Sequence, residues 1–189
     1  GFVWLERPLR PGPLRSAAEA IGAEADYVSE ISLVAPALVR SLSAALRKGA
    51  LLLIDYGFGR REYYHPQRAQ GTLMCHYRHR AHDDPFFLPG LQDLTVHVDF
   101  TSIAEAGIDS GLKLLGYTTQ AQFLINCGIT QLLDQQSEAA AASRFVLTAG
   151  VQKLLSPAEM GELSKVIALA RGIDGPLIGF ASGDKSRLL

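Results

Sequence analysis

The hydrophobic positions of the first third of the chain predict a helix followed by a strand. Apolar side chains recur at spacings of three and four across residues 31–46, as on one face of a helix. Because proline is tolerated only in the first turn, this helix should begin between Ser32 and Pro36, and Gly49 should end it as a left-handed cap. Residues 50–55 then form a short, unbroken apolar run, which is typical of a strand buried on both faces.

The rest of the chain contains further strand and helix patterns. Residues 94–100 alternate apolar and polar side chains like a half-buried strand, and Ser102 with Glu105 forms a capping box for a short helix after it. A helix, a glycine and then a buried strand is the repeating unit of a parallel sheet, so we expect an α/β fold. The other expected elements are a strand or edge hairpin at 1–5, strands at 114–118 and 165–170, and helices at 121–127, at 137–155 (core face Phe145, Val146, Ala149 and Leu154) and from Ser156 onward.

Residues 56–91 show no helical or strand period. This stretch holds four of the five histidines together with five arginines and four tyrosines. An uninterrupted loop of that length is usually functional or mobile.

Composition excludes several classes of protein. With 189 residues, 48% of them hydrophobic and 20% charged, the chain has material for one sizeable core but not for two domains. A net charge of -1 provides no global basic field for nucleic acid or anionic lipid, and no apolar run is long enough to span a bilayer. Cys75 and Cys127 cannot form a disulfide framework and are typical of reduced intracellular thiols. The chain opens without Met or a charged leader, so we expect it to be the interior of a longer protein.

Three motifs suggest ligand chemistry, and each has a plainer interpretation. Asp55 to Gly59 places G-x-G after a strand, but a nucleotide loop needs a helix at the glycines and a third glycine, so a flexible strand exit is favoured. Cys75 and the nearby histidines lack zinc-site spacing and have arginines among them. The mixture of arginine and tyrosine is raw material for RNA stacking, yet Asp83 and Asp84 interrupt the patch.

Asp99 and His97 share the polar face of the strand expected at 94–100. A carboxylate at such a position must be paired or must face a cleft. An ion pair with an arginine of the loop and a catalytic role are both open at this point.

Several stretches together resemble the MidA family of S-adenosylmethionine-dependent methyltransferases. They are, in order, Glu30-Ile31, residues 49–57, Gly71-Thr72-Leu73, His79-Arg80, residues 93–100, Thr118-Thr119-Gln120 and Met160-Gly161-Glu162-Leu163. Mitochondrial members of the family are arginine methyltransferases that act in assembly of respiratory complex I. The resemblance runs along nearly the whole chain.

The resemblance implies that residues 1–189 are the C-terminal part of one methyltransferase domain. The family's glycine-rich cofactor loop lies in an N-terminal half, and no such loop is found in this sequence. The implied fold is the C-terminal part of a Rossmann-like three-layer sandwich with helical additions. Residues 50–55 would be its fifth strand, and 114–118 and 165–170 its closing pair. S-adenosyl-L-methionine would be the cofactor of the full-length protein, with no cofactor-binding or metal-binding residues in this segment.

The resemblance also implies an acceptor site for an arginine side chain. Carboxylates hold a guanidinium in a bidentate fork, and methyl transfer in line depends mainly on positioning. The candidate catalytic carboxylates are Asp55 and Asp99, with Glu30 as a third. The candidate substrate-binding residues are Tyr56, which would wall the pocket, and His79 and Arg80 in a lid.

A non-enzymatic function is the alternative. In that case the α/β body presents the Tyr/Arg/His loop, residues 56–91, to a partner protein. For either function we expect a protein partner, with no nucleic acid or membrane, and a cytoplasmic location in a bacterium or the mitochondrial matrix in a eukaryote.

Overall fold

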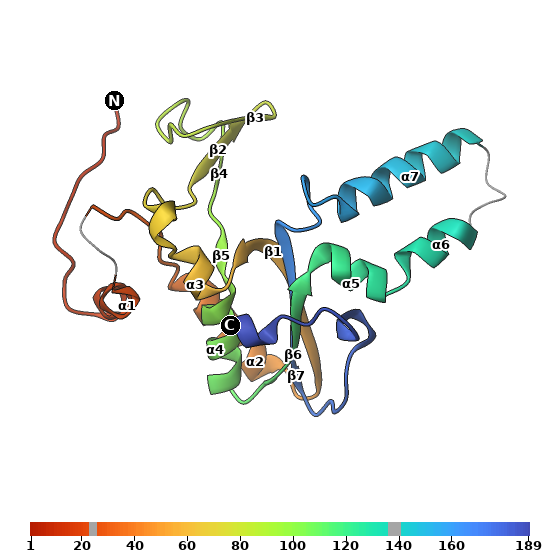
Figure 1. Ribbon diagram of the computed structural model, residues 1–189. Coiled ribbons are helices and arrows are strands. Elements are labelled where there is room, and N and C mark those ends of the chain that lie inside the picture. Colours follow the sequence, from red (N-terminus) through yellow and green to blue (C-terminus); the bar gives the residue numbers. More distant parts are fainter. Residues whose placement is uncertain (23–25, 136–140) are drawn as a thin grey trace.

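A four-stranded sheet forms the centre of the computed structural model, which describes residues 1–22, 26–135 and 141–189 (Figure 1). Its strand order is β5 (Val98–Asp99), β1 (Gly49–Phe58), β7 (Ser164–Arg171) and β6 (Lys113–Thr119). The strands expected at 50–55, 114–118 and 165–170 are confirmed. Because β1 and β6 both run antiparallel to β7, their carboxyl ends lie at the same edge of the sheet, beside the beginning of β7.

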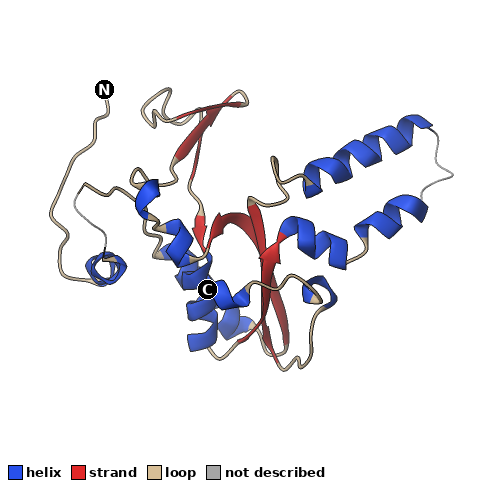
Figure 2. Cartoon of the chain, in the orientation of Figure 1, coloured by secondary structure: helices blue, strands red, loops and turns tan. Residues whose placement is uncertain are grey.

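Alternate residues of β7 pack into two core layers on opposite faces of the sheet. Helices lie on both sides of that sheet (Figure 2). Ile167 and Leu169 pack with α2 (Val34–Ala45) and α4 (Phe100–Asp109). Val166 and Ala168 pack instead with Phe180 of the C-terminal segment, beside α5 (Gln120–Asn126). Helices therefore cover both faces, and the expected three-layer α/β class is confirmed.

Strand β1 is buried on one face only, so the prediction of burial on both faces is wrong. Leu51 and Leu53 pack on the core, whereas Leu52 is 46% exposed and Ile54 is 51% exposed. Opposite β7, the edge of β1 pairs only at Gly57 and Phe58, with β5, among the described residues. A strand with apolar side chains on an open face and a mostly open edge is a surface suited to further packing.

Gly49 does not end the preceding helix, contrary to expectation. The helix stops at Ala45, Leu46 is already extended, and Gly49 is the first residue of β1 with φ of 142°. The helix does begin where Pro36 required, at Val34.

Residues 56–91 are ordered into short elements, so an uninterrupted loop is also wrong. Strand β1 continues to Phe58, and α3 (Arg60–Tyr63) and η1 (Pro66–Arg68) follow. Strands β2 (Met74–Tyr77), β3 (Arg80–His82) and β4 (Asp93–Thr95) then form a small antiparallel sheet that projects from the body (Figure 1). These strands have three or four residues each, which is too short for a periodic pattern.

The tip of this small sheet is a tight two-residue turn. Tyr77 pairs with Arg80, and both residues between them, Arg78 and His79, have positive φ (49° and 63°). Two consecutive positive values are the signature of a type I′ hairpin turn. Arginine and histidine seldom adopt positive φ, and glycine, asparagine and aspartate are more usual in such turns. The sequence pattern therefore did not predict this turn.

The single strand expected at 94–100 is divided, and the helix after it is capped by a different residue. Strand β4 ends at Thr95 and α4 already begins at Phe100. Its cap is Asp99, whose Oδ1 accepts from the backbone N–H of Thr101 (3.0 Å) and Ser102 (3.3 Å). The Ser102 capping box is therefore wrong.

The N-terminal region contains a helix that the sequence pattern did not predict. Residues 1–12 run along the outside of the molecule without forming the expected strand, and α1 (Pro13–Ile21) follows with proline at its first position (Figure 1). Proline is favoured at that position because it has no N–H to leave unpaired.

Two helices form an arm that extends away from the sheet (Figure 1). These are α6 (Ile129–Gln135) and α7 (Ala141–Leu155), and the first part of the helix expected at 137–155 lies outside the described residues. Phe145 is 77% exposed and Val146 is 69% exposed, so the core face proposed for this helix is wrong.

The C-terminal region confirms one short helix and replaces another. The helix expected at 121–127 is α5, followed by Gly128 with positive φ. The helix expected from Ser156 is instead a set of turns, in which the Ser156 carbonyl accepts from the N–H of Gly161 (2.9 Å). The short helices η2 (Ile178–Phe180) and η3 (Ser186–Leu188) complete the chain. No helix among the described residues is long and apolar enough to cross a membrane.

Candidate functional site

A cavity of about 630 Å³, here called the Glu30–Asp99 cavity, lies between the start of α2, α3 and the β5–α4 junction. Two of the three candidate carboxylates, Glu30 and Asp99, line it together with Arg60, Tyr63 and His97. These residues are far apart in the sequence. The fold brings them together because the end of β1 leads directly into α3, while β5 pairs with that same end.

The Glu30 carboxylate is the centre of a hydrogen-bond network. The backbone N–H groups of Thr72 (3.0–3.1 Å) and Leu73 (3.0 Å) donate to it, as do the Thr72 hydroxyl (3.0 Å) and the Tyr63 hydroxyl (3.3 Å). Gly71 has a φ of 74°, and a Cβ there would lie 2.3 Å from Glu30 Oε1. The Gly71-Thr72-Leu73 motif is thus a loop folded closely around this carboxylate.

The same loop connects two other parts of the site. The Thr72 hydroxyl accepts from the backbone N–H of His97 (3.0 Å) while it donates to Glu30. Three of the stretches on which the family resemblance rests therefore form one hydrogen-bonded unit.

The Asp99 carboxylate already has partners. Its Oδ1 caps α4, and its Oδ2 lies 3.4 Å from Nε of Arg60. The guanidinium of Arg60 is held in a bidentate fork by Glu105 (2.8 and 2.5 Å). Burial raises the pKa of Asp99, against the opposing effect of Arg60. A guanidinium thus occupies this corner of the cavity, and it belongs to the chain itself.

Two tyrosines stand against the Glu30 side of the cavity. Burial raises the pKa of Tyr63 to about 12, and it also raises the pKa of Tyr64, whose hydroxyl donates to the Glu30 carbonyl (3.2 Å). Both phenols therefore stay protonated at neutral pH and act as hydrogen-bond donors.

His97 also lines this cavity, although its role was left open at the level of sequence. Burial lowers its pKa, and the positive charges of Arg68 and Lys165 lower it further, against the carboxylates of Glu30 and Asp55. Its buried Nδ1 has no hydrogen-bond partner among the described residues. The imidazole is consequently neutral at pH 7.

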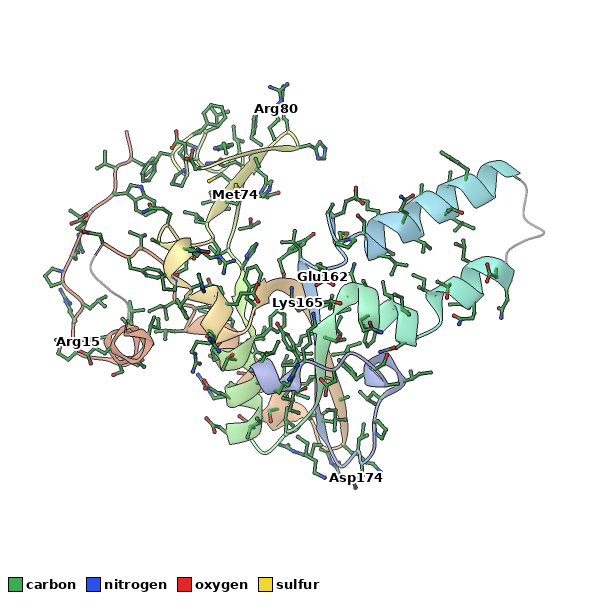
Figure 3. The ribbon with its side chains drawn as sticks, viewed as in Figure 1. Arg15, Met74, Arg80, Glu162, Lys165 and Asp174 are labelled. Carbon is green, nitrogen blue, oxygen red and sulfur yellow. The ribbon has the colours of Figure 1, made fainter. Side chains whose placement is uncertain are left out.

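The other four candidate residues do not line the Glu30–Asp99 cavity. Asp55 is exposed on β1, where its Oδ1 accepts from the N–H of Tyr56 (2.7 Å), and Tyr56 is exposed beside it. His79 and Arg80 lie at the hairpin tip, and Arg80 points away from the body (Figure 3). The six candidates are thus spread over three places, and their roles remain predictions.

The two glycines at the end of β1 are packed closely against other backbone segments. A Cβ on Gly57 would lie 2.2 Å from the Val98 carbonyl, and one on Gly59 would lie 2.7 Å from the Leu188 carbonyl. Both glycines are needed because other backbone segments approach them, and only a four-residue helix follows. The close approach of these backbone segments accounts for the G-x-G pattern without a nucleotide-binding loop. Nor do the described residues contain a group of three metal-ligating side chains, and Cys75 is a buried free thiol.

Residues 1–118 match the family described as "Putative S-adenosyl-L-methionine-dependent methyltransferase". The chain belongs to this family. The structure is similar to a crystal structure from Burkholderia thailandensis bound to S-adenosyl-homocysteine, with a TM-score of 0.93 and 53% identity over 99% of this chain and 48% of that one. A second structure from the same organism has a TM-score of 0.92, 54% identity and coverage of 99% and 50%.

Two eukaryotic relatives carry more specific names. The "Protein arginine methyltransferase NDUFAF7 homolog, mitochondrial" of Drosophila melanogaster is 28% identical over 185 residues, which is 94% of this chain and 38% of that protein. The "Protein arginine methyltransferase NDUFAF7, mitochondrial" of Danio rerio is 31% identical over 138 residues, 70% of this chain and 30% of that protein. The chain spans half or less of the length of each of these four relatives.

Proposed function

We propose that residues 1–189 are the C-terminal part of one methyltransferase domain, and that the full-length protein methylates an arginine side chain of another protein. The observation that carries this proposal is the 53% identity to a structure bound to S-adenosyl-homocysteine, the demethylated form of the cofactor. The names of the fly and fish relatives support a protein arginine as the acceptor. With that function go a role in respiratory complex I assembly and a location in the bacterial cytoplasm or the mitochondrial matrix.

The open side of β1 supports the assignment to part of a domain. Leu52 and Ile54 of β1 are exposed apolar side chains next to a mostly unpaired strand edge. A further parallel strand with its helix would cover both of them. The cofactor site would then lie outside the residues described above, in agreement with the crowded glycines after β1.

The residues of this chain would hold the acceptor rather than the cofactor. S-adenosyl-L-methionine supplies an electrophilic methyl group, and the protein has to orient a guanidinium nitrogen toward it. Asp55 has an accessible carboxylate at the carboxyl end of β1, the edge at which ligands of α/β sheets bind. Asp99 and Glu30 have protein partners, so they orient neighbouring groups in addition to any contact with substrate. Tyr56 walls the site beside Asp55, and the hairpin with His79 and Arg80 is the proposed lid.

Substitution of the two aspartates tests the acceptor site. Asp55→Asn and Asp99→Asn in the full-length enzyme should each reduce turnover at least tenfold, or about 1.4 kcal/mol of barrier. The assay is transfer of labelled methyl groups from S-adenosyl-L-methionine to protein, with the product arginine identified by mass spectrometry. Asp174→Asn is a matched control, because Asp174 is exposed and forms a surface ion pair with Lys113. Normal turnover in both variants would refute the carboxylate clamp.

The projecting hairpin favours the second candidate, a non-enzymatic module that presents residues 56–91 to a partner protein. A surface depression at its tip is lined by Tyr77, Arg78, His82 and Phe87, where aromatic and cationic side chains gather. Under this alternative the full-length protein would bind a partner through the hairpin but would transfer no methyl group. Methyl transfer that persists after Arg80→Ala would favour the enzyme and remove the hairpin tip from the essential parts.

A further inference from the structure

A second cavity, of about 530 Å³, lies at the carboxyl ends of β1 and β6 and is here called the Lys165 pocket. Its walls are largely apolar and are formed by Phe58, Tyr117, Leu163 and Leu188. Lys165, at the beginning of β7, contributes the charged group at its inner end. None of these residues lines the Glu30–Asp99 cavity.

Lys165 is an unusual residue for such a position, because it is only 8% exposed. Its ammonium donates to the carbonyls of Glu162 and Leu163 (3.4 Å for the latter) and lies 5.2 Å from the centre of the Phe58 ring. An ammonium has three N–H donors, and these two carbonyls take two of them. One donor therefore remains for a ligand in the pocket.

The charges around the pocket sum to a positive value. Arg61, Lys165 and Lys185 line it together with two carboxylates, Glu62 and Glu162. Lys185 lies 3.8 Å from Glu162, so these two charges offset each other, and Arg61 and Lys165 then face Glu62 alone. The exposed rim adds little, whereas a buried ammonium acts at low dielectric and dominates the field inside.

A further cation, the guanidinium of Arg68, contacts the Phe58 ring, with 4.2 Å between it and the ring centre. The centres of the Phe58 and His97 rings are 5.1 Å apart. Burial lowers the pKa of Lys165 while the carboxylates of Glu62 and Glu162 oppose this effect and Lys185 adds to it. An anion entering the pocket would relieve the burial cost of the Lys165 charge.

We propose that the Lys165 pocket binds a carboxylate carried on an apolar or aromatic stem. The stem would pack between Phe58 and Tyr117, and the carboxylate would accept the free N–H of Lys165. A guanidinium fits poorly, since it would stand beside a buried positive charge. An acidic peptide segment carries this chemistry, whereas the amino-acid end of the cofactor has an ammonium next to its carboxylate and fits less well beside Lys165. The inference stands on the pocket alone and does not require methyl transfer.

The first test is a titration of 4-phenylbutyrate into the full 189-residue chain, followed by amide NMR shifts. We expect saturable shifts at Phe58, Tyr117 and Leu163, and at least tenfold weaker binding in Lys165→Met, which keeps the length of the side chain. Lys153→Met is the matched control, because Lys153 is exposed on α7 and does not line the pocket. Should Lys165→Met fail to fold, Lys185→Ala at the rim is the second variant, with a loss of about twofold to fivefold expected.

Other probes decide the alternatives. Binding of n-butylguanidinium, a guanidinium on an apolar stem, in preference to 4-phenylbutyrate would overturn the proposal and assign the pocket to Glu62 and Glu162. Absence of shifts with 4-phenylbutyrate, or equal affinity in Lys165→Met, would also overturn it. Displacement of the bound probe by a glutamate-containing peptide would support a polypeptide ligand, whereas displacement by S-adenosyl-homocysteine and not by the peptide would overturn that assignment.

Discussion

The contacts of Glu30 predict that this residue stabilises the fold whether or not it touches substrate. In Glu30→Ala the N–H groups of Thr72 and Leu73 lose their acceptor inside a half-buried loop. Leaving a buried donor unpaired costs about 1–3 kcal/mol. Two such donors, partly reached by water, give a loss of about 3 kcal/mol in the free energy of unfolding.

Glu30→Gln should cost much less, about 1 kcal/mol, because the amide oxygen can still accept from both N–H groups. Its NH₂ would face the hydroxyls of Thr72 and Tyr63, which can accept as well as donate. Gly71→Ala perturbs the same anchor from the other side, since its Cβ would lie 2.3 Å from Glu30 Oε1. We expect it to resemble Glu30→Ala rather than Glu30→Gln.

Urea unfolding followed by circular dichroism measures all three losses. A change of 3 kcal/mol corresponds to a melting temperature lower by about 6–12 °C in a chain of this size. Glu19→Ala serves as the control, because Glu19 is exposed and forms a surface ion pair with Arg15, so its loss should stay within about 0.5 kcal/mol. The proposed stabilising role of Glu30 is refuted if Glu30→Ala is as stable as Glu19→Ala. A catalytic carboxylate without an anchoring role would show the reverse pattern, with Glu30→Gln inactive in the full-length enzyme and Glu30→Ala fully stable.

Two further predictions concern the sheet and the histidine. Arg171 donates to the carbonyls at the end of α2 and to the Ser110 carbonyl (2.6 Å). Arg171→Met should therefore lower the free energy of unfolding by about 2–4 kcal/mol in urea titrations. A change below about 0.5 kcal/mol would contradict this prediction. Burial and the charges of Arg68 and Lys165 lower the pKa of His97 in the folded chain. Below about pH 6.5 the unfolded chain therefore binds more protons than the folded chain, and the free energy of unfolding decreases as the pH decreases. Urea midpoints at pH 7.5 and 5.5 should differ less in His97→Gln than in the unchanged chain, and equal differences would show that His97 is not responsible.

The sequence by itself determined the fold class and the order of the main strands. Strands β1 and β7 contain unbroken apolar runs, and β6 contains a shorter one, so local pattern is enough to find these segments. The family was also visible in short motifs, because the Gly71-Thr72-Leu73 loop needs a glycine at positive φ and Glu30 needs the N–H groups of that loop. Contacts that need one particular residue type can be recognised in the sequence as short motifs.

The tertiary structure alone decided which candidate residues lie together. Asp99 looked like a free carboxylate on a strand, but the chain turns into α4 directly after it, and its oxygens cap that helix and face Arg60. The Lys165 pocket left no motif, because its parts come from β1, β6, β7 and the C-terminal segment. The exposure of Leu52 and Ile54 could not be predicted either, because an apolar residue in the sequence does not show whether the segment that would cover it is present. The hydrophobic pattern shows which residues are able to pack in a core. Which residues they contact depends on how segments that are distant in the sequence are arranged in the fold.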